Sequence, residues 1–204
     1  MKISSSIKTI FWDFDGVLMN SNKVRDQGFI EVLKDFPESQ VNRLMKFHQA
    51  NGGLSRYVKF RHFFEEIRGE SITEQEVSQW ASKFSAIMLN LLIDKNLLIE
   101  ETIDFVKDHY HEYNMHIVSG SDGKELNQIC KGIEIDHFFK SIEGSPVPKV
   151  KLVANILKKE NYNKNQCVLI GDSINDYEAA NKNEIYFQAF GNKSIENKST
   201  YKLL

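Results

Sequence analysis

Cysteine is scarce in this sequence. Its 204 residues include only 2 cysteines, Cys130 and Cys167, whose spacing fits neither a paired metal-ligand motif nor a disulfide framework. This usage is typical of a reducing compartment, so we expect a cytoplasmic protein. Long apolar runs are missing as well: the longest candidate, from Ile87 to Ile93, is interrupted by Asn90. We therefore expect neither a signal peptide nor a membrane helix.

An excess of charge of one sign is also absent. The chain carries 26 lysine and arginine residues against 28 aspartate and glutamate residues, a formal net charge of −2 at pH 7. Nucleic acids and anionic membranes bind basic surfaces, so we expect neither as a partner. Hydrophobic residues make up 41% of the chain and charged residues 26%, which is ordinary for a globular protein. The length suits one domain with a smaller insertion, and nothing in the sequence indicates an oligomeric state.

The first part of the chain predicts one short strand followed only by helices. The strand covers residues 8–13 and ends in acids and Gly16. Thr73 and Glu76 form a capping-box pattern at the start of the last of these helices. The helices before it are predicted over residues 24–36, 41–49 and 55–68.

From about Leu97 onward, predicted strands and helices alternate. This alternation is typical of a parallel sheet with helices on both faces. We therefore expect an α/β protein, in which residues 1–19 and 94–204 form a Rossmann-like parallel-sheet core and residues 20–93 form an inserted α-helical domain. The strands are predicted over residues 115–118, 140–142, 166–170 and 185–190, and the helices over 100–113, 122–131, 150–160 and 174–181.

Polar side chains follow the predicted strands at the points where the strands end. Asp13 and Asp15 follow the first strand, Ser119 the second, and Asp172 and Asp176 a later one. Ligands of parallel α/β sheets bind beyond the carboxyl ends of the strands. Crowded acids repel one another unless a cation joins them, and all-oxygen ligands suit Mg²⁺. The sequence therefore predicts a site for Mg²⁺ and phosphate at this edge of the sheet.

Four segments resemble, in order and spacing, the motifs of the haloacid-dehalogenase-like superfamily. They are Asp13-Phe14-Asp15-Gly16-Val17-Leu18, Val118-Ser119-Gly120, Lys149, and Gly171-Asp172-Ser173-Ile174-Asn175-Asp176. The resemblance covers residues 8–190, and the helical insertion resembles the cap of the phosphoglycolate-phosphatase and β-phosphoglucomutase branch. It implies a Mg²⁺-dependent phosphohydrolase that acts on a small phosphorylated metabolite through an aspartyl-phosphate intermediate.

The resemblance also implies a role for each acid. Asp13 would be the nucleophile and would bind Mg²⁺ together with Asp172 and the main-chain carbonyl of Asp15. Asp176 would steady the water shell of the metal. Asp15 would protonate the leaving alkoxide and later deprotonate water. A free aspartate titrates at about 3.9, so we expect the pKa of Asp15 to be raised.

The other motif residues are expected to hold the phosphoryl group. The hydroxyl of Ser119 and the backbone N–H of Gly120 suit phosphoryl oxygens, and Lys149 supplies a positive charge. In many members of the superfamily the lysine directly precedes a Pro-x-Pro segment, whereas here Lys149 follows Pro146-Val147-Pro148. Lys151 is the alternative for this role.

Substrate choice is expected to depend on the cap. Residues 51–56 resemble a cap loop of the mutase branch, in which an arginine grips a distal phosphate. Arg56 and Lys59 would lie side by side on a helix, and Arg25 enters the first cap helix, so all three are candidates for substrate binding. The alternative is a solvated basic edge. Mutases tend to carry a histidine where this chain has Arg25.

Other functions stay open at this stage. Arg56 weakly favours a sugar phosphomutase of the β-phosphoglucomutase type. A dehalogenase needs no metal and would leave Asp15, Asp172 and Asp176 unexplained. A receiver-like signalling domain would lack a helical insertion of roughly 75 residues. His109, His111 and His116 have no zinc-site spacing, and we interpret them as helix-end and surface residues.

Overall fold

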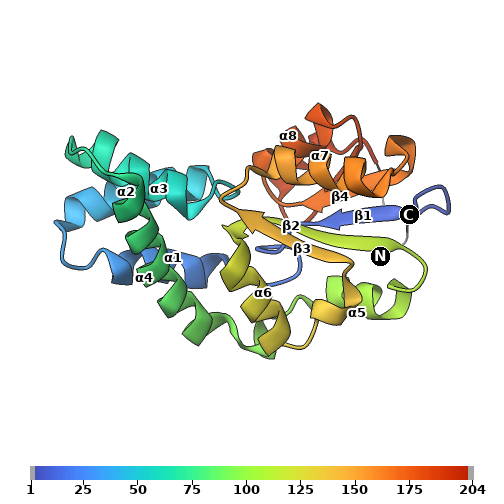
Figure 1. The fold of residues 1–204 in the computed structure, drawn as a ribbon, viewed down its shortest axis with the longest axis horizontal. Coiled ribbons are helices and arrows are strands. Elements are labelled where there is room, and N and C mark those ends of the chain that lie inside the picture. The colour runs from blue at the N-terminus through green and yellow to red at the C-terminus, as the bar shows by residue number, and fades with distance from the viewer. Residues whose placement is uncertain (1–2, 202–204) are drawn as a thin grey trace.

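The computed structural model describes residues 3–201, with a parallel β-sheet at their centre (Figure 1). The sheet has five strands in the order β3-β2-β1-β4-β5, and all four pairings are parallel. This confirms the predicted α/β class. The strands are β1 (Thr9–Trp12), β2 (Asn114–Asp122), β3 (Ser141–Ser145), β4 (Cys167–Gly171) and β5 (Tyr186–Ala189).

Helices cover both faces of the sheet. In Figure 1, α7 (Lys149–Glu160) and α8 (Ile174–Lys182) lie above it, and α5 (Glu100–His109) and α6 (Gly123–Gly132) lie below. Side chains alternate along β1, so Phe11 packs in one hydrophobic cluster while Ile10 and Trp12 pack in the other. Burial on both faces explains why β4 is apolar and why Thr9 is the one polar residue of β1.

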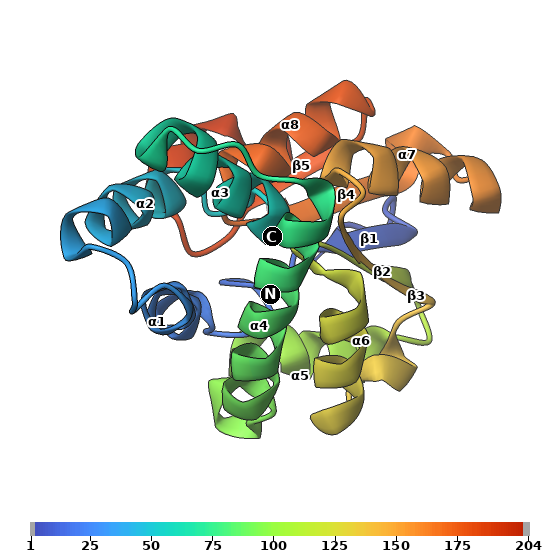
Figure 2. The same ribbon diagram turned by 60° about the vertical axis from the view of Figure 1, so that its left-hand side comes forward.

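A helical insertion between β1 and β2 forms a cap beyond the carboxyl ends of the strands. The strand arrowheads in Figure 1 point toward it, and Figure 2 shows α4 beside α6 of the core. The predicted helical cap is therefore confirmed. Its elements are α1 (Asn22–Val32), α2 (Glu38–Ala50), α3 (Arg56–His62), the π-helical turns η1 (Phe63–Arg68) and α4 (Glu74–Leu92). Short 3₁₀ turns elsewhere are η2 (Lys95–Leu97), η3 (Asp136–Phe138), η4 (Lys164–Gln166) and η5 (Lys193–Lys198).

Aromatic rings hold the cap together. The ring centroid of Phe29 in α1 lies 4.4 Å from that of Phe84 in α4 and 5.5 Å from that of Phe60 in α3. All three side chains are buried. Such ring pairs stabilise a small domain beyond the apolar area that they bury.

Two expectations from the sequence, one about a helix and one about a histidine, are corrected by the fold. The helix expected over residues 55–68 changes to π-helical turns at Phe63. His116 is not a surface residue: it lies in β2 with 1% of its surface exposed, and its ring nitrogens pair with Ser141 Oγ at 2.8 Å and Tyr162 Oη at 3.1 Å. A strand position facing the helix layer can bury a histidine whose two nitrogens both find hydroxyl partners. In the described part of the chain, no helix combines the length and apolarity needed to cross a bilayer.

The capping box at the start of α4 gives a stability prediction. Thr73 Oγ1 accepts from the N–H of Glu76 at 3.3 Å, and Glu76 Oε2 accepts from the N–H of Thr73 at 2.8 Å. We expect Thr73→Ala to lower the free energy of unfolding by about 1 kcal/mol, because a backbone N–H loses its partner. Urea unfolding checks this, with Ser78→Ala at an exposed interior position of the same helix as the control. A loss no larger than that of the control would contradict the prediction.

Candidate active site

Three carboxylates meet at the carboxyl edge of the sheet. Asp13 follows β1, Asp172 follows β4, and Asp176 lies in the first turn of α8; one oxygen of each lies within 4.8 Å of the others. The two strands are neighbours in the sheet, and the N–H of Asp13 donates to the carbonyl of Ile170 at 2.9 Å. The strand order therefore brings together acids that are far apart in the sequence.

Lys149 is the cation of this cluster. It opens α7, its side chain is fully buried, and its Nζ lies 2.8 Å from Asp13 Oδ1 and also pairs with Asp176 Oδ1. Burial alone would lower the pKa of Lys149, but the charges of Asp13 and Asp176 raise it above its ordinary value. Lys151 is exposed on the same helix. Of the two candidate lysines, the structure brings Lys149 to the carboxylates.

One ammonium group does not neutralise three carboxylates. Burial, joined by the negative charge of Asp176, raises the pKa of Asp13 well above its usual range, although Lys149 opposes the shift. Burial and the charge of Asp176 also raise the pKa of Asp172 to about 6. The cluster thus carries negative charge that a cation would stabilise, and carboxylate oxygens are ligands that Mg²⁺ prefers.

The oxygens of Asp176 are already occupied. Oδ1 pairs with Lys149, and Oδ2 accepts from the N–H of Ser173 at 3.0 Å and from its hydroxyl at 2.6 Å. By contrast, Asp172 Oδ2 accepts only a long bond of 3.3 Å from Asn22. Asp13 and Asp172 therefore offer the available oxygens for a metal, while Asp176 positions Lys149.

Gly16 allows the first strand end to approach the fourth. Its φ of +82° lies in the left-handed region, and a Cβ on it would overlap Oδ2 of Asp172. Any other residue would therefore face backbone strain and also displace this carboxylate. Glycine is therefore required at position 16, because Asp172 approaches this backbone closely.

Asp15 is held as a carboxylate. Its Oδ1 accepts from Arg25 Nε at 2.6 Å and from Ser21, and its Oδ2 accepts from Ser121 Oγ at 2.5 Å. Burial would raise the pKa of Asp15, but the charge of Arg25 and these hydrogen bonds outweigh it and the pKa is lowered. The expectation of a raised pKa is wrong for this arrangement, because the sequence did not show that Arg25 folds back onto Asp15.

The cap loop closes over the end of β2. Ser119 is buried there and its Oγ accepts from the N–H of Ser121 at 3.0 Å. A Cβ on Gly120 would overlap the carbonyl oxygen of Gly53 in the cap, and the same carbonyl accepts from Asn175 Nδ2 at 2.7 Å. Core and cap together line a cavity of about 570 Å³, which suits a small ligand. Its lining includes Asp13, Asp15, Arg25, His48, Arg56, Lys59, Ser119, Gly120 and Asp172.

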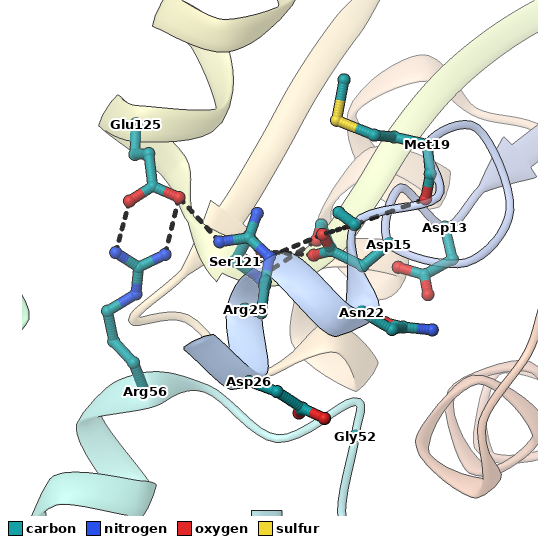
Figure 3. A network of polar contacts seen from close by, with 12 residues as sticks. Asp13, Asp15, Met19, Asn22, Arg25, Asp26, Gly52, Arg56, Ser121 and Glu125 are labelled. Carbon is teal, nitrogen blue, oxygen red and sulfur yellow. Dashed lines mark hydrogen bonds and ion pairs between the residues drawn. The ribbon is translucent and has the colours of Figure 1, made fainter. Parts of the chain in front are cut away.

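The cap arginines are bound by a core glutamate. Arg56 makes two hydrogen bonds to Glu125 of α6, one of them 2.7 Å from Nη2 to Oε1, and Arg25 Nη1 donates to the same oxygen at 2.9 Å. Figure 3 shows a continuous row from Arg56 through Glu125 and Arg25 to Asp15. Arg25, Arg56 and Lys59 are all buried, so the solvated basic edge is excluded.

Glu125 is the residue that the sequence reasoning missed. An acid in the first turn of a helix is common because it complements the positive end of the helix dipole. This position therefore carried no signal that would distinguish a cap contact from an ordinary helix start. Only the folded chain shows Glu125 to be 1% exposed between two cap arginines.

Comparisons with known proteins identify a family and a shared fold. Residues 10–190 match the model of a family described as haloacid dehalogenase-like hydrolase. No curated protein matches the chain in sequence.

Solved structures share the fold at low identity. A β-phosphoglucomutase from Clostridium difficile has a TM-score of 0.75 at 18% identity, with 95% of this chain and 88% of that chain covered. CbbY from Rhodobacter sphaeroides, a mutant in complex with xylulose-(1,5)bisphosphate, has a TM-score of 0.73 at 12% identity, with 92% and 89% covered. A protein described as a predicted phosphoglycolate phosphatase from Haemophilus somnus has a TM-score of 0.69 at 20% identity, with 91% and 85% covered.

The bridge that Glu125 forms between the core and the cap residues Arg25 and Arg56 gives a second prediction. Glu125→Ala would leave two buried guanidinium groups without their shared partner, so we expect the free energy of unfolding to fall by about 3 kcal/mol or more. Glu31→Ala breaks an exposed pair with Lys34 and should cost at most about 1 kcal/mol. Urea unfolding of both variants checks this. Equal losses in the two would show that the bridge contributes no more than a surface pair.

Proposed function

The chain belongs to the haloacid dehalogenase-like hydrolases, and we propose that it is a Mg²⁺-dependent phosphomonoesterase acting on a small phosphorylated metabolite. One observation carries the proposal: the buried Asp13, which lines a cavity together with Asp172, lies beside this acid and the cation Lys149. A nucleophile, a metal-binding carboxylate and a phosphate-binding charge are the groups that phosphoryl transfer needs.

Asp13 would attack the phosphorus atom. The bond from its carboxylate oxygen to phosphorus forms as the ester bond breaks, which leaves an aspartyl-phosphate and a free alcohol. Asp13 and Asp172, with the main-chain carbonyl of Asp15, would hold Mg²⁺, which supplies positive charge that offsets repulsion between nucleophile and phosphate. Lys149 lies where it can stabilise the negative charge on the transferred group.

Asp15 would move the protons. As the ionised group that its contacts favour, it can accept a proton from the water that hydrolyses the aspartyl-phosphate. In the first step it would need a proton for the leaving oxygen. The negative charge of an approaching phosphate dianion raises the pKa of a nearby carboxyl group, so Asp15 would be protonated when the substrate binds.

The remaining motif residues and the cap would hold the substrate. We propose that the hydroxyl of Ser119 and the N–H of Gly120 bind phosphoryl oxygens. Residues 20–93 would act as a cap that excludes bulk water. Residues 1–19 and 94–204 would form the catalytic core. Residues 1–2 and 202–204 lie outside the part of the chain that the structure describes. The contact of Gly53 with the core loops supports closure at this point. A cytoplasmic location stays a prediction from composition.

A sugar phosphomutase is the second candidate. The likeness to a β-phosphoglucomutase fold favours it. The expected grip of Arg56 on a distal phosphate does not, because Arg56 is bound through two nitrogens to Glu125. A dehalogenase would leave the carboxylate cluster without a use.

The nucleophile assignment makes a direct prediction. Asp13→Asn removes the attacking oxygen, so release of phosphate from p-nitrophenyl phosphate with Mg²⁺ should fall to background. Asp108→Asn, at an exposed position of α5, is the matched control and should leave the rate unchanged. Chelation of Mg²⁺ should abolish the reaction of the unaltered protein. Phosphate release that survives Asp13→Asn would refute the assignment.

A lysine pair tests the phosphate-binding charge. Lys149→Met should lower kcat/KM by about 100-fold or more, because a buried charge beside the reacting atoms is lost. Lys151→Met, two residues away and exposed, should have no effect on kcat/KM. Because Lys149→Met leaves buried carboxylates unpaired, unfolding is measured beside the kinetics and rates are taken per folded molecule. Equal kinetics for the two variants would remove Lys149 from the site.

A further inference from the structure

A short segment that follows β5 is hydrogen-bonded to the loop that carries Asp172. The N–H of Phe190 donates to the main-chain carbonyl of Gly171 at 2.9 Å. Two residues later, Asn192 Nδ2 donates to the main-chain carbonyl of Asp172 at 2.7 Å. Asn192 is half-buried and also lines the cavity of the site. The segment therefore supports the backbone of one proposed metal ligand from the side opposite the cap.

The same segment also reaches the end of the first strand. Gly191 has a φ of +66°, in the left-handed region that favours glycine, and the chain bends there after β5. A Cβ on Gly191 would lie 3.7 Å from the carbonyl oxygen of Gly16, the residue that follows the two acids after β1. The segment 190–192 therefore borders both loops whose acids are proposed to hold Mg²⁺.

The backbone around Asp172 is fixed, whereas its carboxylate is nearly free. The N–H of Ser173 donates to Asp176 Oδ2 at 3.0 Å, and Asn192 holds the carbonyl of Asp172. The carboxylate of Asp172 accepts only a bond of 3.3 Å, from Asn22. A ligand whose backbone is already ordered loses less conformational entropy when it binds a metal. The contact from Asn192 therefore favours metal binding by this carboxylate.

The amide group of Asn192 serves two different partners. Its Oδ1 accepts from the N–H of Ser194 at 3.0 Å and from the hydroxyl of Ser194 at 2.7 Å, which begins the turn η5. Ile195 in this turn is 2% exposed and packs in the same hydrophobic cluster as Phe187 of β5. The turn thus anchors one side of the amide while Nδ2 reaches Asp172. A serine could cap such a turn, but its shorter side chain would not reach that carbonyl.

We propose that Asn192 is a positioning residue of the metal site, which sets the direction of the Asp172 carboxylate by holding the main-chain carbonyl of Asp172. Asn192 acts through Asp172 and contacts neither the metal nor the phosphate. This inference rests on the proposed phosphatase function, since it deepens the assignment of Asp172 as a ligand of Mg²⁺. Residues that orient a metal ligand typically change metal affinity by about 10- to 100-fold when they are replaced.

Two variants separate this role from that of a turn cap. Asn192→Ala removes both the bond to Asp172 and the cap of η5. Asn192→Ser also removes the bond to Asp172, but it keeps a side-chain oxygen that can accept from the N–H of Ser194. Asn197→Ala, at an exposed position of the same turn, is the matched control.

Magnesium affinity, measured by titration calorimetry, is the direct readout. We expect the Kd for Mg²⁺ to rise about 10-fold in both Asn192 variants and to stay unchanged in Asn197→Ala. The Mg²⁺ concentration for half-maximal hydrolysis of p-nitrophenyl phosphate should rise by the same factor. At saturating Mg²⁺ the rate should stay within about twofold of the unaltered protein, because the metal then restores the position of Asp172. Urea unfolding without Mg²⁺ gives the folded fraction, and affinities are taken per folded molecule.

The serine variant decides the outcome. A Kd for Mg²⁺ within about twofold of the unaltered protein in Asn192→Ser would overturn the proposal, because Asn192 would then serve only to cap the turn. An equal loss of affinity in Asn197→Ala would overturn it as well, since the effect would not depend on the bond to Asp172.

The same measurements separate failure of the positioning role from failure of the phosphatase function. If phosphate is released in an Asp13-dependent way while the Asn192 variants bind Mg²⁺ as the unaltered protein does, the positioning role alone is refuted. If no ester is hydrolysed but Mg²⁺ binding weakens in both Asn192 variants, the positioning role stands and the phosphatase function is refuted. If the unaltered protein does not bind Mg²⁺, both are refuted.

Discussion

Three carboxylates, of which Asp13 and Asp176 are buried and Asp172 is half-buried, share a single ammonium group at the carboxyl edge of the sheet, and the rest of the site depends on that imbalance. Asp13, Asp172 and Asp176 converge because β1 and β4 are adjacent, and Lys149 compensates for only part of their charge. The remaining negative charge would repel a phosphate ester. A divalent cation held by Asp13 and Asp172 would offset this repulsion, and carboxylate oxygens are ligands that suit Mg²⁺.

The cap is joined to this cluster by a second set of buried charges. Glu125 of the core binds Arg56 and Arg25, and Arg25 in turn binds Asp15. Figure 3 shows these contacts, and the position of the cap and the orientation of Asp15 therefore depend on the same side chains. A buried network of this kind stabilises the closed cap only while every member is paired, so it also fixes the shape of the cavity.

The candidate site residues at the strand ends could be predicted from the sequence because each lies in a short local pattern. Short apolar strands, alternating with helices, predicted the parallel sheet, and acids at the strand ends predicted a metal and phosphate site. The lowered pKa of Asp15 and the part played by Glu125 could not be predicted, since both depend on how the cap helices fold back onto the core. The burial of His116 was missed for a similar reason: its partners come from β3 and from the residues after α7.

The central claim is that Asp13 carries the phosphoryl group between the two half-reactions, and a rapidly quenched reaction tests it most directly. The protein is mixed with Mg²⁺ and a reactive phosphate ester, stopped in acid within the first turnover, and its peptides are analysed by mass spectrometry. We predict one added phosphoryl group on the peptide that contains Asp13, located on that side chain and lost on brief exposure to alkali. Hydrolysis of the ester with no phosphorylated Asp13, or with the group on another residue, would contradict the claim.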